Sequence, residues 1–429
     1  MNTYVMYTAP SRESSPFATV SLSRIKRKYL LATGSALLTV LTVGDAANGD
    51  SWICVDEFIH HPAIAILFIL IPAVGAILSI LLAVLPRVVQ VNLLIFVCLW
   101  LLIEGIFQVI NTQQAPLENE NREALNGGKY FMSDAALGYR PVPNSIERHT
   151  ESHDHHMEFD VTYHFDSFGR RSTPPGPQAQ PVDFLLFFGD SNTLGTGLKE
   201  DETLPYYAGQ LAPGYQPYNY GFSGWGPGQM LELLKSGEIP AQLRQREGFA
   251  IFFFIKDHLA RVAGSSLVAA SWGSDFPYYA LDRENHLVRK GDFAHGRRFL
   301  TLFYYLVSRS PIAQHFGLTL PGRYSDYDYR LTAEILAESQ RLLRHQLKLR
   351  GFYVVISPAF DKTQLDTYRT FEAYLQRAGV KYTDYTELYD TAEVKYRLSN
   401  WNYHNSALAN RLIAEQLLKD LGITGAGNP

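Results

Sequence analysis

The chain contains the run Leu185-Leu-Phe-Phe-Gly-Asp-Ser-Asn-Thr-Leu-Gly-Thr-Gly197, from which its fold class follows. Four apolar residues without alternation are typical of a strand that is buried on both faces of a parallel sheet. Small polar residues then follow Gly189, and a helical pattern resumes near Thr203. The carboxyl edge of a parallel sheet is where α/β folds place their chemistry. Ser191 is therefore a candidate nucleophile, and the alternative is that Asp190 and Ser191 only cap a helix.

From Val182 onward, strand-like and helix-like segments alternate, which predicts a parallel sheet with helices on both faces. The predicted strands are 184–188, 215–220, 250–255, 352–357 and 380–383. The predicted helices are 204–211, 229–236, 331–349, 364–378 and 405–421. Residues 263–329 break the alternation and are rich in Tyr, Phe, Trp and Gly, so we expect an insertion beside the carboxyl edge. Such an insertion suits sugar or acyl-chain binding, and simple packing explains it equally well.

A histidine begins the last predicted helix, within the run Asn402-Tyr-His-Asn-Ser-Ala-Leu408. A histidine at a helix start, after an aromatic-rich loop, is well placed to face a site at the carboxyl edge. A lone histidine is more often structural, but His404 follows Ser191 in the chain order that a serine–histidine site requires. It is the candidate general base.

The N-terminal region is strongly apolar. Residues 62–85 and 91–110 each exceed 18 residues with at most one charge, which predicts two transmembrane helices. Residues 29–44 form a shorter apolar run directly after the basic segment 24–28. A signal peptide has the same pattern, but the late basic cluster and the spans that follow favour a third retained helix. We therefore expect a membrane region at 29–111.

The basic residues predict how these spans are oriented. Residues 1–28 should be a cytoplasmic tail, the acidic loop 45–57 should lie outside, and Arg87 should lie inside. Three spans then place everything after Asn111 on the outer face, whereas two spans would leave it in the cytoplasm. Glu104 lies within the last span, where we favour a position near the outer interface over a functional role.

Residues 112–181 are predicted to form a polar linker and a small extended pre-domain. Period-2 alternation at 159–165 indicates a strand, and the run Thr173-Pro-Pro-Gly-Pro177 marks a boundary. Histidines cluster nearby but fit no compact metal site, so we predict neither a metal nor a cofactor. This cluster comprises His149, His153, His155 and His156.

Composition excludes one class of partner. The net charge of −4 and the absence of a basic stripe give no electrostatic basis for binding nucleic acid. Cys54 lies in a polar loop and Cys98 in an apolar helix, so no disulfide is expected, and cysteine usage does not identify the compartment.

Three segments together resemble sequence blocks of the SGNH (GDSL-type) hydrolases. They are Gly189-Asp190-Ser191 with Thr193 and Gly195, Asn219-Tyr-Gly-Phe-Ser-Gly224, and His404-Asn405. The resemblance covers residues 182–421, within a domain placed at 182–424, and the segment 200–205 also resembles bacterial members. It implies a flavodoxin-like three-layer fold. Because bacterial members with N-terminal spans carry an extracytoplasmic catalytic domain, it also implies an inner-membrane protein whose catalytic domain is periplasmic or otherwise extracytoplasmic.

The resemblance further implies covalent acyl chemistry. Ser191 would attack an ester carbonyl, and His404 would take its proton. The amide N–H groups of Ser191 and Gly224 would hold the oxyanion, where the loss of one donor typically costs about 3 kcal/mol. Asp190 and Asn219 would shape the loops.

Two departures from the family pattern affect these roles. Members usually carry an aspartate two or three residues before the histidine, where this chain has Asn402 and Trp401. His404 could then act in a dyad, another acid could substitute, or the site could be slow or inactive.

The third block normally contains an Asn-Asp pair but reads Ile255-Lys256-Asp257-His258 here. His258 or Lys256 could take the place of the missing oxyanion donor. Asp257 could be the missing acid, and a helix cap is the alternative for it.

Three functions are consistent with these residues. The first is a membrane-anchored esterase that removes acyl groups from a carbohydrate or lipid. The second is an O-acyltransferase that modifies an extracytoplasmic polysaccharide with an integral-membrane partner. The third is a non-catalytic carbohydrate-binding or scaffold protein on a degenerate hydrolase fold.

Overall fold

The computed structural model describes most of the chain after residue 85. The described residues are 86–114, 119–124, 130–153, 156–174, 176–177 and 180–423. The chain divides into two compact units, residues 1–106 and 107–429. The predicted tail at 1–28 and the predicted spans at 29–44 and 62–85 lie outside the described residues, as does Cys54.

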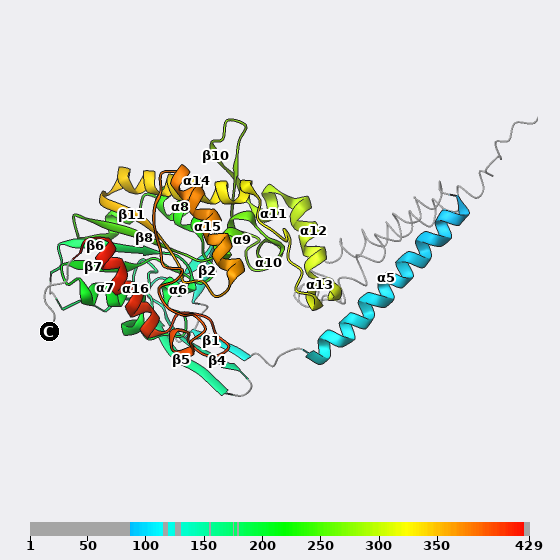
Figure 1. Ribbon diagram of the computed structural model, residues 1–429, viewed down its shortest axis with the longest axis horizontal. Helices are drawn as coiled ribbons and strands as arrows, with labels where there is room; N and C mark the ends of the chain where they lie inside the picture. Colours follow the sequence, from blue (N-terminus) through cyan, green and yellow to red (C-terminus); the bar gives the residue numbers. More distant parts are fainter. Residues whose placement is uncertain are drawn as a thin grey trace, which may run out of the picture. The chain divides into compact units, whose positions relative to one another are not determined.

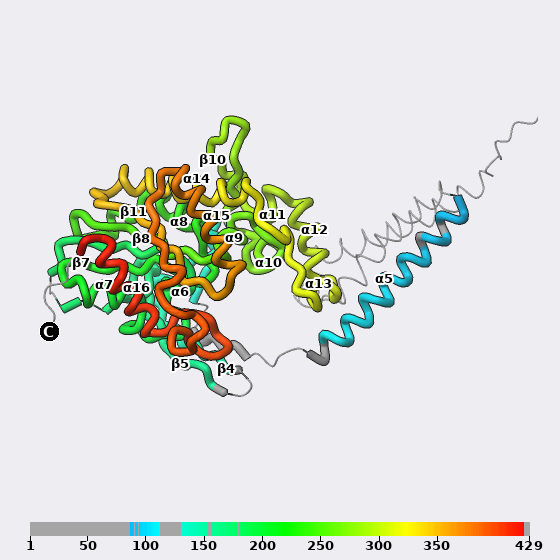
Figure 2. The backbone as a smooth tube through the Cα atoms, in the orientation of Figure 1, coloured from blue at the N-terminus to red at the C-terminus, as the bar shows by residue number. Residues whose placement is uncertain are grey.

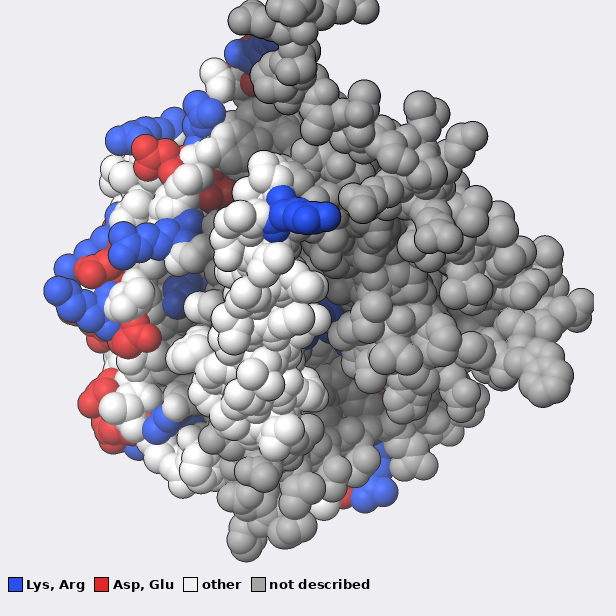
Figure 3. All heavy atoms as spheres, turned by 90° about the vertical axis from the view of Figure 1, so that its right-hand side faces the viewer, with Lys and Arg blue, Asp and Glu red and all other residues white. Residues whose placement is uncertain are grey.

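Helix α5 (Arg87–Gln114) contains the last predicted span. Its segment Arg87–Asn111 is long and apolar enough to cross a membrane, and it is the one such helix among the described residues. A bilayer core requires about 20 apolar residues, which this segment of 25 residues provides. Figure 3 shows few charged side chains along it.

Two small antiparallel sheets precede the main domain. One has the order β1-β4-β5, and the other pairs β2 with β3. The bounds are β1 Asn119–Ala124, β2 Phe131–Asp134, β3 Gly138–Pro141, β4 Ile146–His153 and β5 His156–His164. The predicted strand at 159–165 corresponds to the second half of β5. Phe159 and Tyr163 of β5 are buried in a cluster with Leu194, at the end of the short helix α6 (Ser191–Leu194), and with Phe222 of the loop after β7 (Tyr215–Asn219).

The main sheet has five parallel strands in the order β12-β11-β8-β6-β7. Their bounds are β6 Asp183–Phe188, β7 Tyr215–Asn219, β8 Glu247–Phe254, β11 Lys348–Ile356 and β12 Lys381–Asp384. In order along the chain these are strands 1 to 5, so the sheet order is 2-1-3-4-5. This is the doubly wound order of flavodoxin-like folds, in which the strand order reverses between strands 1 and 3.

Helices cover both faces of this sheet, which makes three layers (Figure 1). Their bounds are α7 Leu204–Leu211, α8 Pro227–Lys235, α14 Asp326–Gln346, α15 Lys362–Arg377 and α16 Ala407–Asp420. Alternate side chains of β6 separate the two cores. Phe184 and Leu186 pack in the core that contains residues of α8, α14 and α15, whereas Leu185 and Phe187 pack in the core of α7 and α16. The run at 185–188 is apolar throughout because both its faces are buried.

The predicted insertion forms a separate group of short elements (Figure 2). Its elements, which follow α9 (Asp257–Ala263), are α10 Ser266–Ala269, β9 Pro277–Leu281, β10 Leu287–Asp292, α11 Phe293–Gly296, α12 Arg298–Ser308 and α13 Pro311–His315. Some of its aromatic residues, such as Phe276 and Phe293, are buried. On α12, by contrast, Phe299, Leu302 and Phe303 are 84%, 56% and 53% exposed.

Candidate active site

Ser191 is the first residue of the short helix α6 (Ser191–Leu194), which begins directly after β6 and Gly189-Asp190. The Asp190 carboxylate caps this helix, because it accepts the backbone N–H of Asn192 at 3.0 Å. The turn ends at Gly195 in the left-handed conformation, with φ of 84°. Ser191 therefore lies at the carboxyl edge of the sheet, after one of the two strands between which the winding of the chain reverses.

The loop before α16 brings His404 to this serine. Nε2 of His404 lies 2.8 Å from Oγ of Ser191. Beside this contact, the backbone N–H of Asn405 donates to Oδ1 of Asn192 at 3.3 Å. These two contacts join segments that are more than 200 residues apart in the sequence, and the Oγ–Nε2 distance is within the range that a serine nucleophile and a histidine base require for acyl transfer.

Asn402 holds the other side of the imidazole. Its Oδ1 lies 2.7 Å from Nδ1 of His404 and accepts the backbone N–H of His404 at 3.2 Å. A carbonyl oxygen only accepts, so we assign the ring proton to Nδ1. Nε2 is then unprotonated and can accept the hydroxyl proton of Ser191. Asn402 thus lies where the aspartate of related sites is expected.

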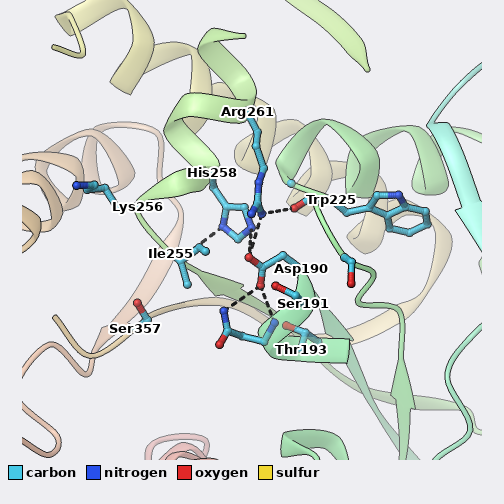
Figure 4. Close-up of polar contacts among 12 residues, drawn as sticks. Asp190, Ser191, Thr193, Trp225, Ile255, Lys256, His258, Arg261 and Ser357 are labelled. Atoms are coloured by element: carbon cyan, nitrogen blue, oxygen red, sulfur yellow. Dashed lines mark hydrogen bonds and ion pairs between the residues drawn. The ribbon is translucent and has the colours of Figure 1, made fainter. Parts of the chain in front are cut away.

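A buried charged cluster supports the nucleophile loop. Figure 4 shows the side chains of Asp190, His258 and Arg261 pointing toward one another. Nη1 of Arg261 donates to Oδ2 of Asp190 at 2.9 Å and to the carbonyl oxygen of Trp225 at 2.6 Å. Burial has the largest single effect on Asp190 and opposes its ionisation, but the nearby positive charge of Arg261 and the hydrogen bonds that the carboxylate accepts together outweigh burial and lower the pKa of this carboxyl.

His258 does not lie where its predicted role as an oxyanion donor requires. Its ring has no exposed surface, and its Nδ1 accepts the backbone N–H of Ile255 at 3.1 Å. Nε2 lies 3.7 Å from Oδ2 of Asp190. Burial lowers the pKa of His258 to about 3, so the ring is neutral at pH 7. A side chain enclosed in this way cannot reach a bound ester.

Lys256 and Asp257 lie at the start of α9. The backbone N–H of Lys256 donates to the hydroxyl oxygen of Tyr368 at 3.1 Å. Asp257 is exposed in the first turn of α9, and its charge contributes to the raised pKa values of Tyr324 and Tyr368, which burial mainly causes. The position behind His404, where we predicted Asp257 as a possible acid, is taken by Asn402.

The loop after β7 carries the second predicted oxyanion donor. Gly224 has φ of +78°, and a Cβ atom there would meet the hydroxyl of Tyr139 and the ring of Trp272. The amide of Asn219 ties this loop to the nucleophile helix, because its Nδ2 donates to the carbonyl oxygen of Thr193 at 2.9 Å while its Oδ1 accepts the N–H of Gly221 at 3.0 Å. The backbone N–H groups of Ser191 and Gly224 have no hydrogen-bond partner among the described residues.

Sequence reasoning missed Arg171, whose guanidinium supports the end of the nucleophile turn. It is fully buried, lies over the ring of Tyr163, and donates to the carbonyl oxygens of Leu194, Gly195 and Leu198 at 2.7, 2.6 and 2.5 Å. Nothing in the local sequence distinguishes it from the neighbouring Arg170.

Of the predicted histidine cluster, the side chains of His153, His155 and His156 lie outside the described part of the structure. His149 is buried, with Nδ1 3.3 Å from the hydroxyl of Tyr163. Among the described residues, one group has the spacing to hold an ion, namely Asp282, Glu284 and His286 in the β9–β10 turn. Backbone N–H groups of that turn already donate to Asp282, so it carries no metal assignment.

The comparisons with known proteins found similarity among solved structures. No protein-family model and no curated protein matches the sequence. A lipolytic protein of the G-D-S-L family from Veillonella parvula is 13% identical, with 55% of this chain and 96% of that chain covered and a TM-score of 0.31. A catalytic mutant of an acetylxylan esterase from Geobacillus stearothermophilus is 13% identical, with 59% and 100% covered and a TM-score of 0.32. An acetyl xylan esterase from Butyrivibrio proteoclasticus is 11% identical, with 66% and 73% covered and a TM-score of 0.33.

Proposed function

We propose that this chain is a membrane-anchored serine esterase of the SGNH type, which hydrolyses an acyl ester of a carbohydrate or lipid. The observation that carries the proposal is the hydrogen-bonded series from Ser191 through His404 to Asn402. It supplies a nucleophile, a base whose unprotonated Nε2 faces Oγ of Ser191, and a group that orients the base. A degenerate scaffold would have no need to keep this series intact.

The first step forms the acyl-enzyme. Oγ of Ser191 attacks the ester carbonyl carbon while Nε2 of His404 takes the hydroxyl proton. The carbonyl oxygen gains the electron pair, and the N–H groups of Ser191 and Gly224 stabilise its charge. The bond to the leaving alcohol then breaks, and that alcohol receives the proton from His404.

The second step releases the acid. A water molecule gives its proton to Nε2 of His404 and attacks the acyl carbon, and the bond to Oγ of Ser191 then breaks as the serine regains its proton. The oxygen of Asn402 accepts the Nδ1–H of the imidazolium throughout. An amide stabilises that cation less than a carboxylate does, which predicts slower turnover than in an aspartate-containing site.

A second candidate is acyl transfer to a sugar hydroxyl instead of water. Trp401 and Tyr403 lie on either side of Asn402 in the sequence and are 65% and 56% exposed. Trp272, beside Gly224, is 45% exposed. Exposed aromatic faces around a polar centre suit a saccharide, which could be either the acyl donor or the acceptor. An integral-membrane acyl-transfer partner would belong to this second candidate.

Two observations support the membrane anchor. Helix α5 has the length and composition of a membrane span. In the catalytic unit, the exposed apolar side chains of α12 are flanked by Arg298 and Arg309, a pattern that suits contact with a lipid surface. A reporter fused after Lys129 should be active on the outer side of a bacterial inner membrane. Cytoplasmic reporter activity would overturn the outward orientation.

The catalytic proposal is tested with the full chain in detergent. We expect hydrolysis of 4-nitrophenyl acetate and labelling by a fluorophosphonate probe, both lost in Ser191→Ala. Adding an oligosaccharide acceptor distinguishes hydrolysis from acyl transfer through the acylated sugar product. Activity that persists unchanged in Ser191→Ala would refute the assignment of the nucleophile.

A further inference from the structure

The amide of Asn402 has a second partner that the proposed reaction does not use. Its Nδ2 donates to Oε2 of Glu151 at 3.3 Å. Glu151 lies on β4 of the small antiparallel sheet, 251 residues away in the sequence. Asn402 is 8% exposed, so its side chain is held almost entirely by protein contacts. A carboxylate from the pre-domain therefore reaches the group that orients the catalytic base.

The chemistry of the two partners fixes the direction of the amide. An asparagine side chain accepts at one end and donates at the other, whereas a carboxylate only accepts. Glu151 therefore selects the orientation in which Nδ2 points toward it and Oδ1 points toward His404. The backbone N–H of His404 donates to Oδ1 and selects the same orientation from the other side.

The opposite orientation would disable the base. Nδ2 would then face the Nδ1–H and the backbone N–H of His404, so that hydrogen-bond donors would face one another without an acceptor. The ring could satisfy Nδ1 only by moving its proton to Nε2, the atom that must accept the proton of Ser191. An asparagine that replaces a triad aspartate is known to cost activity through this wrong tautomer, by about 10⁴-fold in the best-studied serine protease. A carboxylate that accepts from Nδ2, as Glu151 does, prevents the amide from taking this opposite orientation.

We propose that Glu151 is a positioning residue that fixes the amide of Asn402, and thereby the Nδ1–H tautomer of His404. The inference rests on the proposed serine-hydrolase function. It accounts for a site without the usual aspartate, because the carboxylate is present but lies one residue further from the imidazole. The small sheet is then part of the catalytic centre, and the globular domain alone does not complete it.

A second carboxylate of the same sheet holds the same loop in a different way. Oγ of Ser399 accepts the backbone N–H of Asn402 at 3.0 Å and donates to Oε1 of Glu158 on β5 at 2.7 Å. Glu158 therefore tethers the loop backbone, whereas Glu151 contacts the side-chain amide. This difference makes Glu158→Ala a matched control for loosening of the loop.

The test compares Glu151→Ala and Glu158→Ala in two backgrounds, the natural chain and the Asn402→Asp variant. An aspartate has two equivalent acceptor oxygens and needs no orientation. We therefore expect Glu151→Ala to lower kcat about 10-fold or more in the natural chain, with KM nearly unchanged, and to cause no loss in the Asn402→Asp background. Glu158→Ala should act equally in both backgrounds. A kcat for Glu151→Ala within about twofold of the natural chain, or an equal loss in both backgrounds, would overturn the inference.

A readout independent of turnover separates this inference from the proposed function. With ¹⁵N-labelled histidine, the His404 resonances, assigned by their loss in His404→Gln, should report the Nδ1–H tautomer in the natural chain. Glu151→Ala should shift them toward the Nε2–H form. If the natural chain neither turns over ester nor reacts with fluorophosphonate, the proposed function fails, but this spectrum still decides whether Glu151 orients the amide. An unchanged spectrum in Glu151→Ala refutes that role.

Discussion

Nδ1 of His404 lies 2.7 Å from Oδ1 of Asn402, so an amide oxygen rather than a carboxylate orients the imidazole. Asn402→Leu keeps the approximate volume of the side chain but removes this acceptor. We expect kcat for 4-nitrophenyl acetate to fall by about 10²-fold with little change in KM, because His404 loses its orientation while Ser191 and the proposed oxyanion donors are unchanged. The control is Gln376→Leu, which removes an exposed amide on α15. Equal kcat values for Asn402→Leu and the natural chain would show that His404 needs no orienting group.

Gly224→Ala tests the second oxyanion donor. A Cβ at φ of +78° would meet Tyr139 and Trp272, so the loop must move and carry the backbone N–H with it. Loss of one oxyanion donor costs about 3 kcal/mol of transition-state stabilisation, which predicts a fall in kcat of about 10²-fold. Gly237→Ala is a matched control, since Gly237 has φ of +70° but open space around its Cβ position. A similar kcat for both variants would place the oxyanion hole elsewhere.

The layered fold could be predicted from the sequence because burial on both faces leaves a direct signature. The apolar runs of β6 and β8 are uninterrupted, and each predicted strand and helix of the main domain overlaps an observed one. The predicted and observed ends of some elements differ, because the sequence patterns used did not include the residues that favour a helix start. Helix α8 begins at Pro227 rather than Gln229, because proline is favoured in the first turn of a helix, where its missing N–H has no partner to lose.

The order of the sequence blocks predicted that Ser191 and His404 lie close together. It did not predict the residues that support them. Arg171, Arg261 and Glu151 act through contacts with residues at least 23 positions away, which no local pattern encodes. The error for His258 arose because a position within a motif does not tell which way its side chain points. At the start of α9 its ring points into the core, between Phe252 and Phe254.

His258 should make stability depend on pH. Burial lowers its pKa in the folded state from 6.5 to about 3, against the opposing attraction of Asp190 and with the added repulsion of Arg261. Between these two values the unfolded chain binds more protons than the folded chain, so the free energy of unfolding rises with pH. Stability is therefore lost as the pH falls from 6.5 toward 3. Asp190, whose pKa is lowered from 3.8, adds a loss only below that value.

The measurement is denaturant unfolding between pH 7 and pH 4, followed by tryptophan fluorescence. His258→Gln removes the titrating ring, and its side-chain oxygen can still accept the N–H of Ile255. We expect a flatter pH dependence in this variant than in the natural chain. His286→Gln, at an exposed histidine of the β9–β10 turn, controls for the loss of a histidine as such. Identical slopes for His258→Gln and the natural chain would contradict the buried neutral ring.

Arg171→Met should destabilise the domain and slow the reaction together. The guanidinium satisfies three backbone carbonyl oxygens of the turn that follows Ser191, and methionine offers none of these donors. A buried acceptor that loses its hydrogen-bond donor typically costs about 1–3 kcal/mol in the free energy of unfolding, and Arg171→Met leaves three such acceptors. Arg148→Met is the control, because Arg148 pairs with Asp160 at the exposed face of β4 and β5 and should cost about 1 kcal/mol or less. If Arg171→Met lost stability but kept kcat at a temperature where it stays folded, the guanidinium would hold the turn without setting the position of Ser191.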